Sequence, residues 1–411
     1  MEQINYQLLK SIEESVGTPF YLMNEEQYIT NVRSFVSAFK TRYHSVIAGY
    51  SFKTNYVPAL CVIAKEEGAW AEVVSEMEYR LALSLGFTNI IFNGPIKKEH
   101  VLIDALLRGC IVNLDSMYEV DCIISYLEKN PSQKFSVGLR VNINLTGQDG
   151  ESSIQCGLKE GRFGFTRESI QIAITRLQEY GVEIISLHGH TSSKDRAVEN
   201  YKVIVQQMLS ICTDYKLYNV KFFNVGGGFF GAAAKGIDVS NKPTYVTYAN
   251  AILDILMSNE WFNKVEPNIV IEPGVSVVAN AFTYVCKVFQ HKVINGKDYL
   301  TTDGCVFDIK PTLHQNNLPH SLIQESPSKG QLTYNVVGST CMEKDILLNQ
   351  INLPTANYGD FLKVEGVGAY TISLTPTFIN FLPPIVSVSD NGIKVIRRRQ
   401  TIEDVLTLYK Y

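Results

Sequence analysis

The amino-acid sequence predicts an α/β protein in which a (β/α)8 TIM barrel is followed by an all-β domain. Up to Pro273, short runs of β-branched residues alternate with stretches of helical spacing, which is the pattern of parallel βα units. After Pro273, short alternating runs separated by turn residues replace the helical spacing. The chain has 411 residues, of which 45% are hydrophobic and 19% charged, so it can form two domains with buried cores.

The barrel is predicted from eight strand candidates with helical stretches between them. Eight βα units suit a closed barrel, whose usual size is about 250 residues, and an open doubly wound sheet is the alternative architecture. We therefore assign residues 28–273 to the barrel. The candidate strands are residues 46–52, 71–74, 89–93, 110–114, 135–142, 182–188, 220–225 and 268–272, and the helical stretches include 57–67, 76–85, 116–129 and 245–259.

The remaining residues are predicted to form a β-sandwich or β-barrel-like domain. Asn295-Gly296 and Asp390-Asn391-Gly392 are typical of hairpin turns between alternating runs. We assign residues 274–411 to this domain, together with residues 1–27, which contain the short apolar piece 19–22. The candidate strands are residues 282–288, 297–302, 332–337, 360–364, 385–388 and 392–397.

Composition excludes several classes of function. The net charge of -4 argues against a nucleic-acid partner, and we interpret the one basic run, 397–399, as a solvated edge or a dimer contact. No apolar stretch is long enough to span a bilayer, and residues 1–5 lack the pattern of a secretory signal. A cytoplasmic protein without membrane contact is therefore expected. The 8 cysteines show no CxxC pair and no zinc spacing, which predicts reduced thiols and no metal site.

Polar residues gather at the predicted carboxyl ends of the barrel strands, where barrels of this type carry their catalytic groups. A purely structural barrel does not need so many polar residues and glycines at one mouth. They are Lys53, Glu72, Arg140, His188, His190, Gly226, Gly227, Gly228 and Glu272.

Three of these features have both a chemical and a structural interpretation. Lys53 among aromatic residues could be a desolvated amine nucleophile or a solvated charge. Backbone N–H groups of Gly226–Gly228 could converge on an anion, or the glycines could form a tight turn. Glu272 ends an apolar strand and could pair with a protonated pyridine nitrogen or with a barrel arginine. Together they supply an aldehyde partner, a phosphate cradle and a ring-nitrogen partner, which is what pyridoxal phosphate requires.

As an ordered set, the motifs resemble the fold type III pyridoxal-phosphate decarboxylases, which include the diaminopimelate, ornithine and arginine decarboxylases. The resemblance runs from about residue 18 to residue 384. It implies an alanine-racemase-like barrel, pyridoxal phosphate as cofactor, a small amino-acid substrate and a homodimer with shared active sites. The matching segments are Tyr50–Lys53, Glu72–Ser75 with Glu78, His190–Ser193, Val225–Gly228, Gly338–Cys341 and Gly366–Tyr370.

The resemblance implies a role for each matching residue. Lys53 is the expected Schiff-base lysine, and Cys341 is expected to reach into the partner subunit's site, where it or Lys53 returns a proton to Cα. His190 is expected to stack on the pyridine ring, while Glu272 keeps the ring nitrogen charged. The residues expected to bind the cofactor are Lys53, Glu72, Arg140, His190, Ser193, Gly226, Gly227, Gly228, Glu272, Gly274 and Tyr370.

The substrate side departs from the family pattern. Val275 and Met342 stand where the family has arginine and an acid, and Lys310 and His314 replace its Arg-Pro-x-x-Tyr segment. Because methionine cannot pair with an ammonium group, we expect a modified or conjugated diamino acid from a siderophore or natural-product pathway, joined to another acid or a carrier protein. The alternatives are a diaminopimelate, ornithine or lysine decarboxylase of primary metabolism, a racemase, and a catalytically silent regulator. Lys310, His314, Met342 and Glu343 are the expected substrate contacts.

Overall fold

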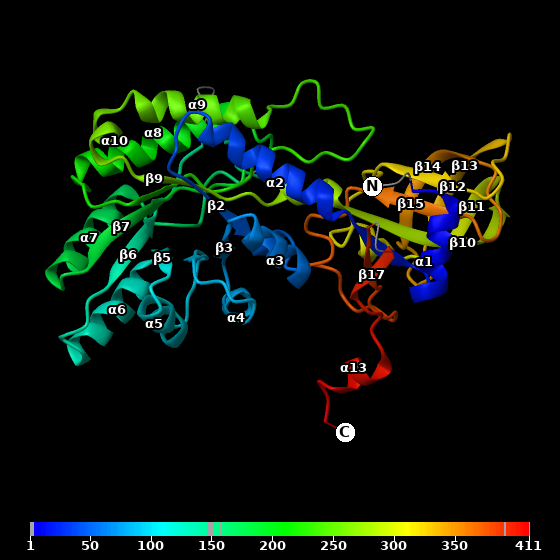
Figure 1. The fold of residues 1–411 in the computed structure, drawn as a ribbon, viewed down its shortest axis with the longest axis horizontal. Helices are drawn as coiled ribbons and strands as arrows, with labels where there is room; N and C mark the ends of the chain where they lie inside the picture. The colour runs from blue at the N-terminus through cyan, green and yellow to red at the C-terminus, as the bar shows by residue number, and fades with distance from the viewer. Residues whose placement is uncertain (1–3, 146–151, 156–157, 390–391, 411) are drawn as a thin grey trace. The chain divides into compact units, whose positions relative to one another are not determined.

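The computed structural model describes residues 4–145, 152–155, 158–389 and 392–410 (Figure 1). The chain divides into two compact units. We call residues 31–231 and 240–276 the barrel unit, and residues 1–30, 232–239 and 277–411 the sheet unit.

The barrel unit contains a closed barrel of parallel strands, which confirms the predicted fold class over the open sheet. Closure is made by β2 and β9, which pair in parallel from Val46↔Ile269 to Ala48↔Ile271. In order around the barrel the strands are β2 (Val46–Ser51), β3 (Trp70–Val73), β4 (Ile90–Phe92), β5 (Ile111–Leu114), β6 (Ser136–Arg140), β7 (Glu183–His188), β8 (Phe222–Asn224) and β9 (Asn268–Ile271).

Helices connect these strands and lie outside them in Figure 1. Several begin at a side chain that accepts a hydrogen bond from the first turn, as Ser75, Thr166 and Thr244 do. Such caps stabilise a helix by about 1 kcal/mol each. The helices are α2 (Glu25–Lys40), α3 (Pro58–Glu66), α4 (Glu76–Ser84), α5 (Glu99–Leu107), α6 (Met117–Lys129), α7 (Arg167–Glu179), α8 (Val198–Asp214), α9 (Tyr245–Met257) and α10 (Glu260–Val265), with the 3₁₀ turn η1 (Phe52–Thr54) directly after β2.

The sheet unit is built on one 9-stranded mixed sheet. Its main path runs β14-β13-β11-β10-β1-β16-β17, and β15 pairs with β10 and β12. The N-terminal strand β1 lies between β10, to which it is antiparallel, and β16, to which it is parallel. The strands are β1 (Phe20–Met23), β10 (Phe282–Ile294), β11 (Lys297–Thr302), β12 (His320–Ile323), β13 (Gln331–Val337), β14 (Ile346–Pro354), β15 (Phe361–Glu365), β16 (Ile385–Ser389) and β17 (Gly392–Arg397).

Several elements after Pro273 and before β1 differ from the sequence prediction. Strands β12 and β14 were not among the strand candidates, because β12 is short and β14 breaks the alternation with the polar pair Asn349-Gln350. Short helices also occur there. They are α1 (Tyr6–Val16), α11 (Val275–Val278), η3 (Ala279–Ala281), α12 (Val306–Ile309) and α13 (Ile402–Leu406).

The basic run of the sheet unit makes contacts within the chain. Arg397 Nη2 donates to the carbonyl of Pro383 at 2.7 Å, and Arg399 Nη2 donates to the carbonyl of Pro19 at 2.9 Å. Arg398 pairs with Asp404 at the start of α13. Among the described residues, no helix has the length and apolar character needed to cross a membrane.

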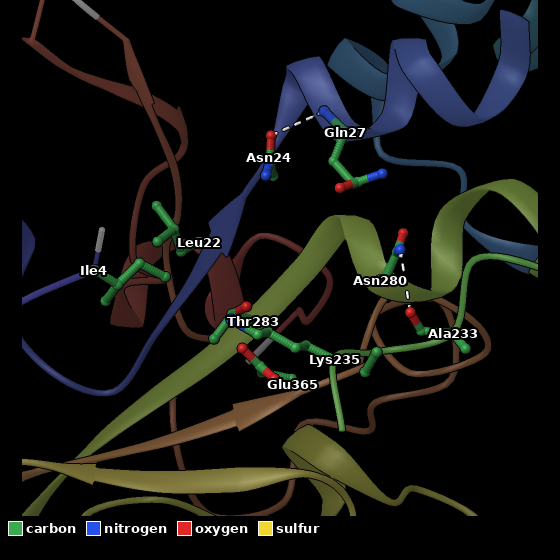
Figure 2. A pocket seen from close by; sticks show the side chains of 10 residues that line it. Ile4, Leu22, Asn24, Gln27, Ala233, Lys235, Asn280, Thr283 and Glu365 are labelled. Carbon is green, nitrogen blue, oxygen red and sulfur yellow. Dashed lines mark hydrogen bonds between the residues drawn. The ribbon is translucent and has the colours of Figure 1, made fainter. Parts of the chain in front are cut away.

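A cavity of about 380 Å³ lies in the sheet unit beside the start of α2 (Figure 2). Its polar wall comes from Asn24, Gln27 and Asn280, and Lys235 and Glu365 contribute one charge of each sign. None of the predicted site residues lines this cavity.

Candidate active site

The Lys53 side chain forms an ion pair at the carboxyl end of the barrel. Lys53 lies in η1, and its Nζ is 2.7 Å from Glu72 Oε2 and 3.1 Å from Ser51 Oγ. The Glu72 side chain has no exposed surface, whereas that of Lys53 is 29% exposed. A reagent from solvent can therefore reach the amine, while its counter-ion is held inside the barrel.

Glu272 follows β9 and is buried. Its Oε1 accepts hydrogen bonds from Asn224 Nδ2 at 2.7 Å and Asn93 Nδ2 at 2.8 Å. Burial disfavours the charged form, but His188, whose Nε2 lies 3.6 Å from Oε1, and Lys53 hold the pKa of Glu272 well below its ordinary value. Glu272 is therefore a buried carboxylate, suited to bind a cation.

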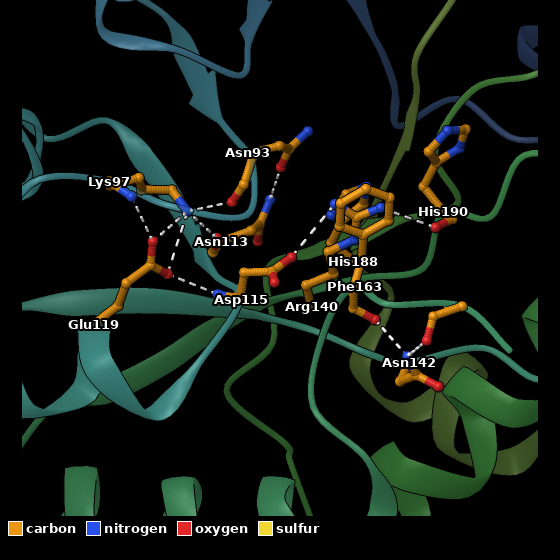
Figure 3. A network of polar contacts seen from close by, with 12 residues as sticks. Asn93, Lys97, Asn113, Asp115, Glu119, Arg140, Asn142, Phe163, His188 and His190 are labelled. Atoms are coloured by element: carbon orange, nitrogen blue, oxygen red, sulfur yellow. Dashed lines mark hydrogen bonds and ion pairs between the residues drawn. The ribbon is translucent and has the colours of Figure 1, made fainter.

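Arg140 ends β6 in a network that Figure 3 shows together with Asp115 and His190. Its Nη1 lies 3.4 Å from Asp115 Oδ1, and its Nη2 donates to the His190 carbonyl at 3.0 Å. The guanidinium lies 4.6 Å from the ring centre of Phe163. Burial lowers the pKa of Arg140, yet arginine remains charged at neutral pH. The Nε atom is buried and has no hydrogen-bond partner in the part of the chain that the structure describes, so it is one donor that a ligand could satisfy.

His190 is held as a neutral ring by the glycine loop. The Gly227 N–H donates to His190 Nδ1 at 3.1 Å, which places the ring proton on Nε2. Burial, with the nearby charges of Lys53 and Arg140, lowers the pKa of His190 from 6.5 to about 3. The imidazole is therefore uncharged at physiological pH and presents a flat, neutral face.

The glycine loop after β8 needs glycine because other atoms come very close. A Cβ on Gly226 would lie 2.6 Å from His190 Cβ, and one on Gly227 would lie 2.5 Å from the Glu272 carbonyl oxygen. Gly226 and Gly228 also have positive φ angles of 71° and 88°. Similarly, a Cβ on Gly274 would lie 2.3 Å from Thr54 Oγ1. The loop is thus built against His190 and Glu272.

The structure brings the predicted barrel residues together and adds several that were not among the predicted site residues. Direct contacts join Lys53 to Glu72 and Arg140 to the His190 carbonyl. Glu72 and Glu272 share the partner Asn93. The Ser193 hydroxyl accepts from the Arg196 N–H at 3.1 Å. The additional residues are Asn93, Asn113, Asp115, Asn224, Lys97 and Glu119, and they lie with His188, one of the two histidines expected at the barrel mouth.

Lys97 and Glu119 form a buried ion pair beside this network (Figure 3). The Lys97 ammonium lies 3.2 Å from Glu119 Oε1, and both side chains have no exposed surface. Lys97 Nζ also donates to the Gly94 and Asn113 carbonyls at 3.0 and 2.9 Å. Glu119 Oε2 accepts from the Asp115 N–H at 2.7 Å. The pair therefore connects the segments that follow β4 and β5.

The sequence carried one signal for the additional residues. It was a single polar residue at or near the end of an apolar strand, such as Asn93 or Asn113.

The other predicted site residues belong to the sheet unit. Cys341 is exposed, and its loop is held by Asp345, whose Oδ2 accepts from the Thr340 hydroxyl at 2.6 Å and the Thr340 N–H at 3.0 Å. Burial lowers the pKa of Lys310 and of His314. Met342 is partly exposed, Glu343 is exposed, and Tyr370 is 40% exposed with a φ of 52°. Of the other cysteines, six are buried and free, and Cys156 lies outside the described residues.

The barrel residues fit pyridoxal phosphate. The site offers an amine at Lys53 on a side chain that is 29% exposed, a buried carboxylate at Glu272 and a glycine loop with no room for a Cβ at Gly226 or Gly227. It also offers buried nitrogens that have no hydrogen-bond partner among the described residues, which are His188 Nδ1 and Arg140 Nε. Lys53 matches the aldehyde of pyridoxal phosphate, Glu272 matches its pyridine nitrogen, and the glycine loop matches its phosphate.

Comparison with known proteins agrees with this fit. Residues 29–279 match the family described as "Pyridoxal-dependent decarboxylase, pyridoxal binding domain". The chain is 28% identical over 415 residues to a probable chloroplastic diaminopimelate decarboxylase from Oryza sativa subsp. japonica, covering 97% of this chain and 81% of that protein. It is also 28% identical over 415 residues to the diaminopimelate decarboxylase of Methanocaldococcus jannaschii, with 96% and 92% covered.

The crystal structure of diaminopimelate decarboxylase from M. jannaschii with L-lysine superimposes with a TM-score of 0.86 and 25% identity, over 98% of this chain and 94% of that chain. Because the family match spans more than half of the residues, the chain belongs to the pyridoxal-dependent decarboxylases. It is an enzyme of the carboxy-lyase class, and its cofactor is pyridoxal phosphate.

Proposed function

We propose that this decarboxylase removes the α-carboxylate of a free diamino acid, with diaminopimelate as the first candidate, and that Lys53 carries the cofactor. The observation that carries the proposal is the placement of Lys53 and Glu272 on one hydrogen-bonded network at the barrel mouth. The names of the curated relatives support diaminopimelate as the substrate.

The residues that would hold pyridoxal phosphate all lie at the carboxyl ends of the barrel strands, apart from Tyr370. When bound, the cofactor supplies an electron sink for the electron pair that remains when CO2 leaves. The residues are Lys53 for the aldehyde, Glu72 and Arg140 beside it, His190 against the ring, Glu272 at the ring nitrogen, and Gly226, Gly227, Gly228, Gly274, Ser193 and Tyr370 around the phosphate.

Each group of the chain contributes a definite physical property. Glu272, kept ionised by its neighbours, would hold a proton on a ring nitrogen placed against it. Glu72 would keep the Lys53 nitrogen in place through their ion pair. His190 is neutral, so it can lie flat against an aromatic ring without adding charge. Cys341, exposed on its loop, would serve as a proton donor to Cα.

The substrate side decides between two classes of amino acid. Lys310, His314, Met342 and Glu343 remain our proposed substrate contacts. Met342 alone favours the conjugated substrate of a siderophore or natural-product pathway, since it cannot pair with an ammonium group. The names of the relatives instead favour the primary-metabolism alternative. Glu343, exposed next to Met342, could supply the missing carboxylate, and we therefore prefer the free diamino acid.

We propose a cytoplasmic homodimer in which Cys341 serves the site of the partner subunit. The support is the family resemblance of the segment Gly338–Cys341, together with the exposure of the Cys341 thiol. A single monomeric species in sedimentation equilibrium at micromolar concentration would contradict the dimer.

The substrate proposal is tested by measuring CO2 release from the cofactor-loaded protein. The panel contains diaminopimelate, lysine, ornithine, arginine and diamino acids conjugated to a second acid. We expect release from diaminopimelate and a loss of at least tenfold in kcat/KM for Glu343→Gln, since a distal ammonium would lose its partner. Release only from a conjugated amino acid would contradict the proposal, and interconversion of stereoisomers without CO2 would indicate a racemase.

A further inference from the structure

One asparagine of the barrel contacts both buried glutamates of the site. Asn93, directly after β4, donates from Nδ2 to Glu72 Oε1 at 2.9 Å and to Glu272 Oε1 at 2.8 Å. Asn93 is 2% exposed, and the two glutamates are 0% and 2% exposed. A single amide therefore links a carboxylate within β3 to one directly after β9, in an interior where water screens charges only weakly.

The orientation of this amide is fixed by its partners. Carboxylates only accept hydrogen bonds, so the Nδ2 group must face the glutamates and Oδ1 must face away. Asn93 Oδ1 accepts from Asn113 Nδ2 at 2.8 Å, a contact drawn in Figure 3. Asn113 Oδ1 accepts in turn from Ser186 Oγ at 2.8 Å. We call this chain of hydrogen bonds, from Ser186 through Asn113 to Asn93, the relay. Each of its donors points towards the two carboxylates.

The barrel leaves room for the relay at one glycine of β6. A Cβ on Gly138 would lie 1.9 Å from Asn113 Oδ1 and 2.8 Å from Ser186 Cβ. No side chain larger than hydrogen fits there while Asn113 keeps its place. The amide chain is therefore a specific arrangement of the barrel interior.

The relay ends on the carboxylate that pairs with Lys53. Lys53 Nζ lies 2.7 Å from Glu72 Oε2, the other oxygen of the group that Asn93 contacts. The remaining ionisable groups that act on these two glutamates are His188, His190, Arg140 and Glu78. A change of charge on Glu72 must change the proton affinity of the nitrogen beside it.

We infer that Asn93 is a positioning residue that holds Glu72 and Glu272 as a pair of carboxylates and, through Glu72, sets the protonation of the Lys53 nitrogen. The inference rests on the proposed attachment of the cofactor to Lys53. Asn93 itself acts only through the glutamates, and its amide is the group that donates to both of them, whereas Asn224 donates to Glu272.

The test is the pH midpoint of the absorbance change of the bound cofactor, measured without substrate in the loaded enzyme. Asn93→Ala removes a donor that draws negative charge from both carboxylates, so Glu72 attracts the proton on the Lys53 nitrogen more strongly and the protonated form is stabilised more. We expect the midpoint to rise by about one pH unit. Ser186→Ala is the matched control, because it removes only the far end of the relay, and we expect a rise of less than about 0.3 unit.

Two outcomes overturn the inference. An unchanged midpoint in Asn93→Ala, together with a lower melting temperature, would show that the amide only supports the fold. If Asn93→Ala does not retain the cofactor, Asn93→Ser takes its place, because its hydroxyl can donate to one carboxylate. A smaller shift in the same direction supports the inference, and no shift overturns it. Borohydride reduction of the loaded wild-type enzyme that places the cofactor on a lysine other than Lys53 would overturn the role of Lys53 itself, which separates the two failures.

Discussion

At the level of single residues, burial and charge oppose each other in the site. Burial works against the charge on Glu272, while His188 and Lys53 favour it, and the outcome is an ionised group. At His190, burial and the charges of Lys53 and Arg140 act in the same direction, so the ring stays neutral. The same barrel interior therefore holds one group charged and its neighbour uncharged, because their partners differ.

The pKa of His190 predicts an acid-dependent loss of stability. The folded-state value is about 3, against an ordinary value of 6.5. As the pH falls below 6.5, the unfolded chain takes up a proton that the folded chain refuses, so the free energy of unfolding falls. His190→Gln keeps an acceptor for the Gly227 N–H and does not titrate.

We expect wild type to lose about 2 kcal/mol more than His190→Gln between pH 7 and pH 5. Urea unfolding of the cofactor-free proteins at the two pH values measures the difference. Equal losses in the two proteins would contradict the low pKa of His190.

Charged site residues could be predicted from the sequence, and amide residues could not. Lys53, Glu72 and Glu272 each place a charge at the end of an apolar strand, which by itself requires explanation. Asn93 and Asn113 have the same position but a neutral side chain, and surface-facing amides at strand ends are common. Their importance depends on which side chains of neighbouring strands face them, and this follows from the barrel register.

At the level of elements, the loop after β8 is shaped by close approach as well as by backbone angles. Gly227 has an ordinary φ, yet a Cβ there would lie 2.5 Å from the Glu272 carbonyl oxygen. The Gly227 N–H is also the donor to His190. A side chain at this position would therefore displace the loop from both His190 and Glu272.

Gly227→Ala is predicted to weaken cofactor binding by at least about tenfold, because backbone atoms must move to relieve the contact. The measurement is equilibrium binding of pyridoxal phosphate to the cofactor-free protein. Gly181→Ala is the matched control, since Gly181 has a positive φ of 70° and open space around it. This control should lose stability but bind the cofactor as wild type does. Equal affinities in wild type and Gly227→Ala would contradict the role of the loop.

The barrel elements were predicted more accurately than those of the sheet unit. The barrel strands are short runs in which most residues are buried, and such runs stand out between helices. In the sheet unit, β12 is only half-buried and β14 carries polar residues in its middle. Their place in the sheet depends on pairing with distant strands, such as β12 with β15 and β13 with β14, which a local pattern does not contain.

At the level of the whole molecule, fold and cofactor could be predicted from the order of motifs along the chain. The family match and the shared fold confirm both. The substrate could not be predicted from the order of motifs. Met342 favours a conjugated amino acid, whereas the names of the relatives favour a free diamino acid. The residues expected to contact the substrate also lie in the sheet unit, whereas the cofactor groups other than Tyr370 lie in the barrel unit.

In the whole molecule, we propose that one lysine, Lys53, carries the cofactor. Borohydride reduction of the loaded enzyme followed by peptide mapping measures this directly, because reduction makes the lysine linkage permanent. We expect the cofactor mass on the peptide containing Lys53. Lys53→Ala should lose both this label and CO2 release, whereas the control Lys65→Ala should keep both. Label on a different lysine, or turnover in Lys53→Ala close to that of wild type, would contradict the proposal.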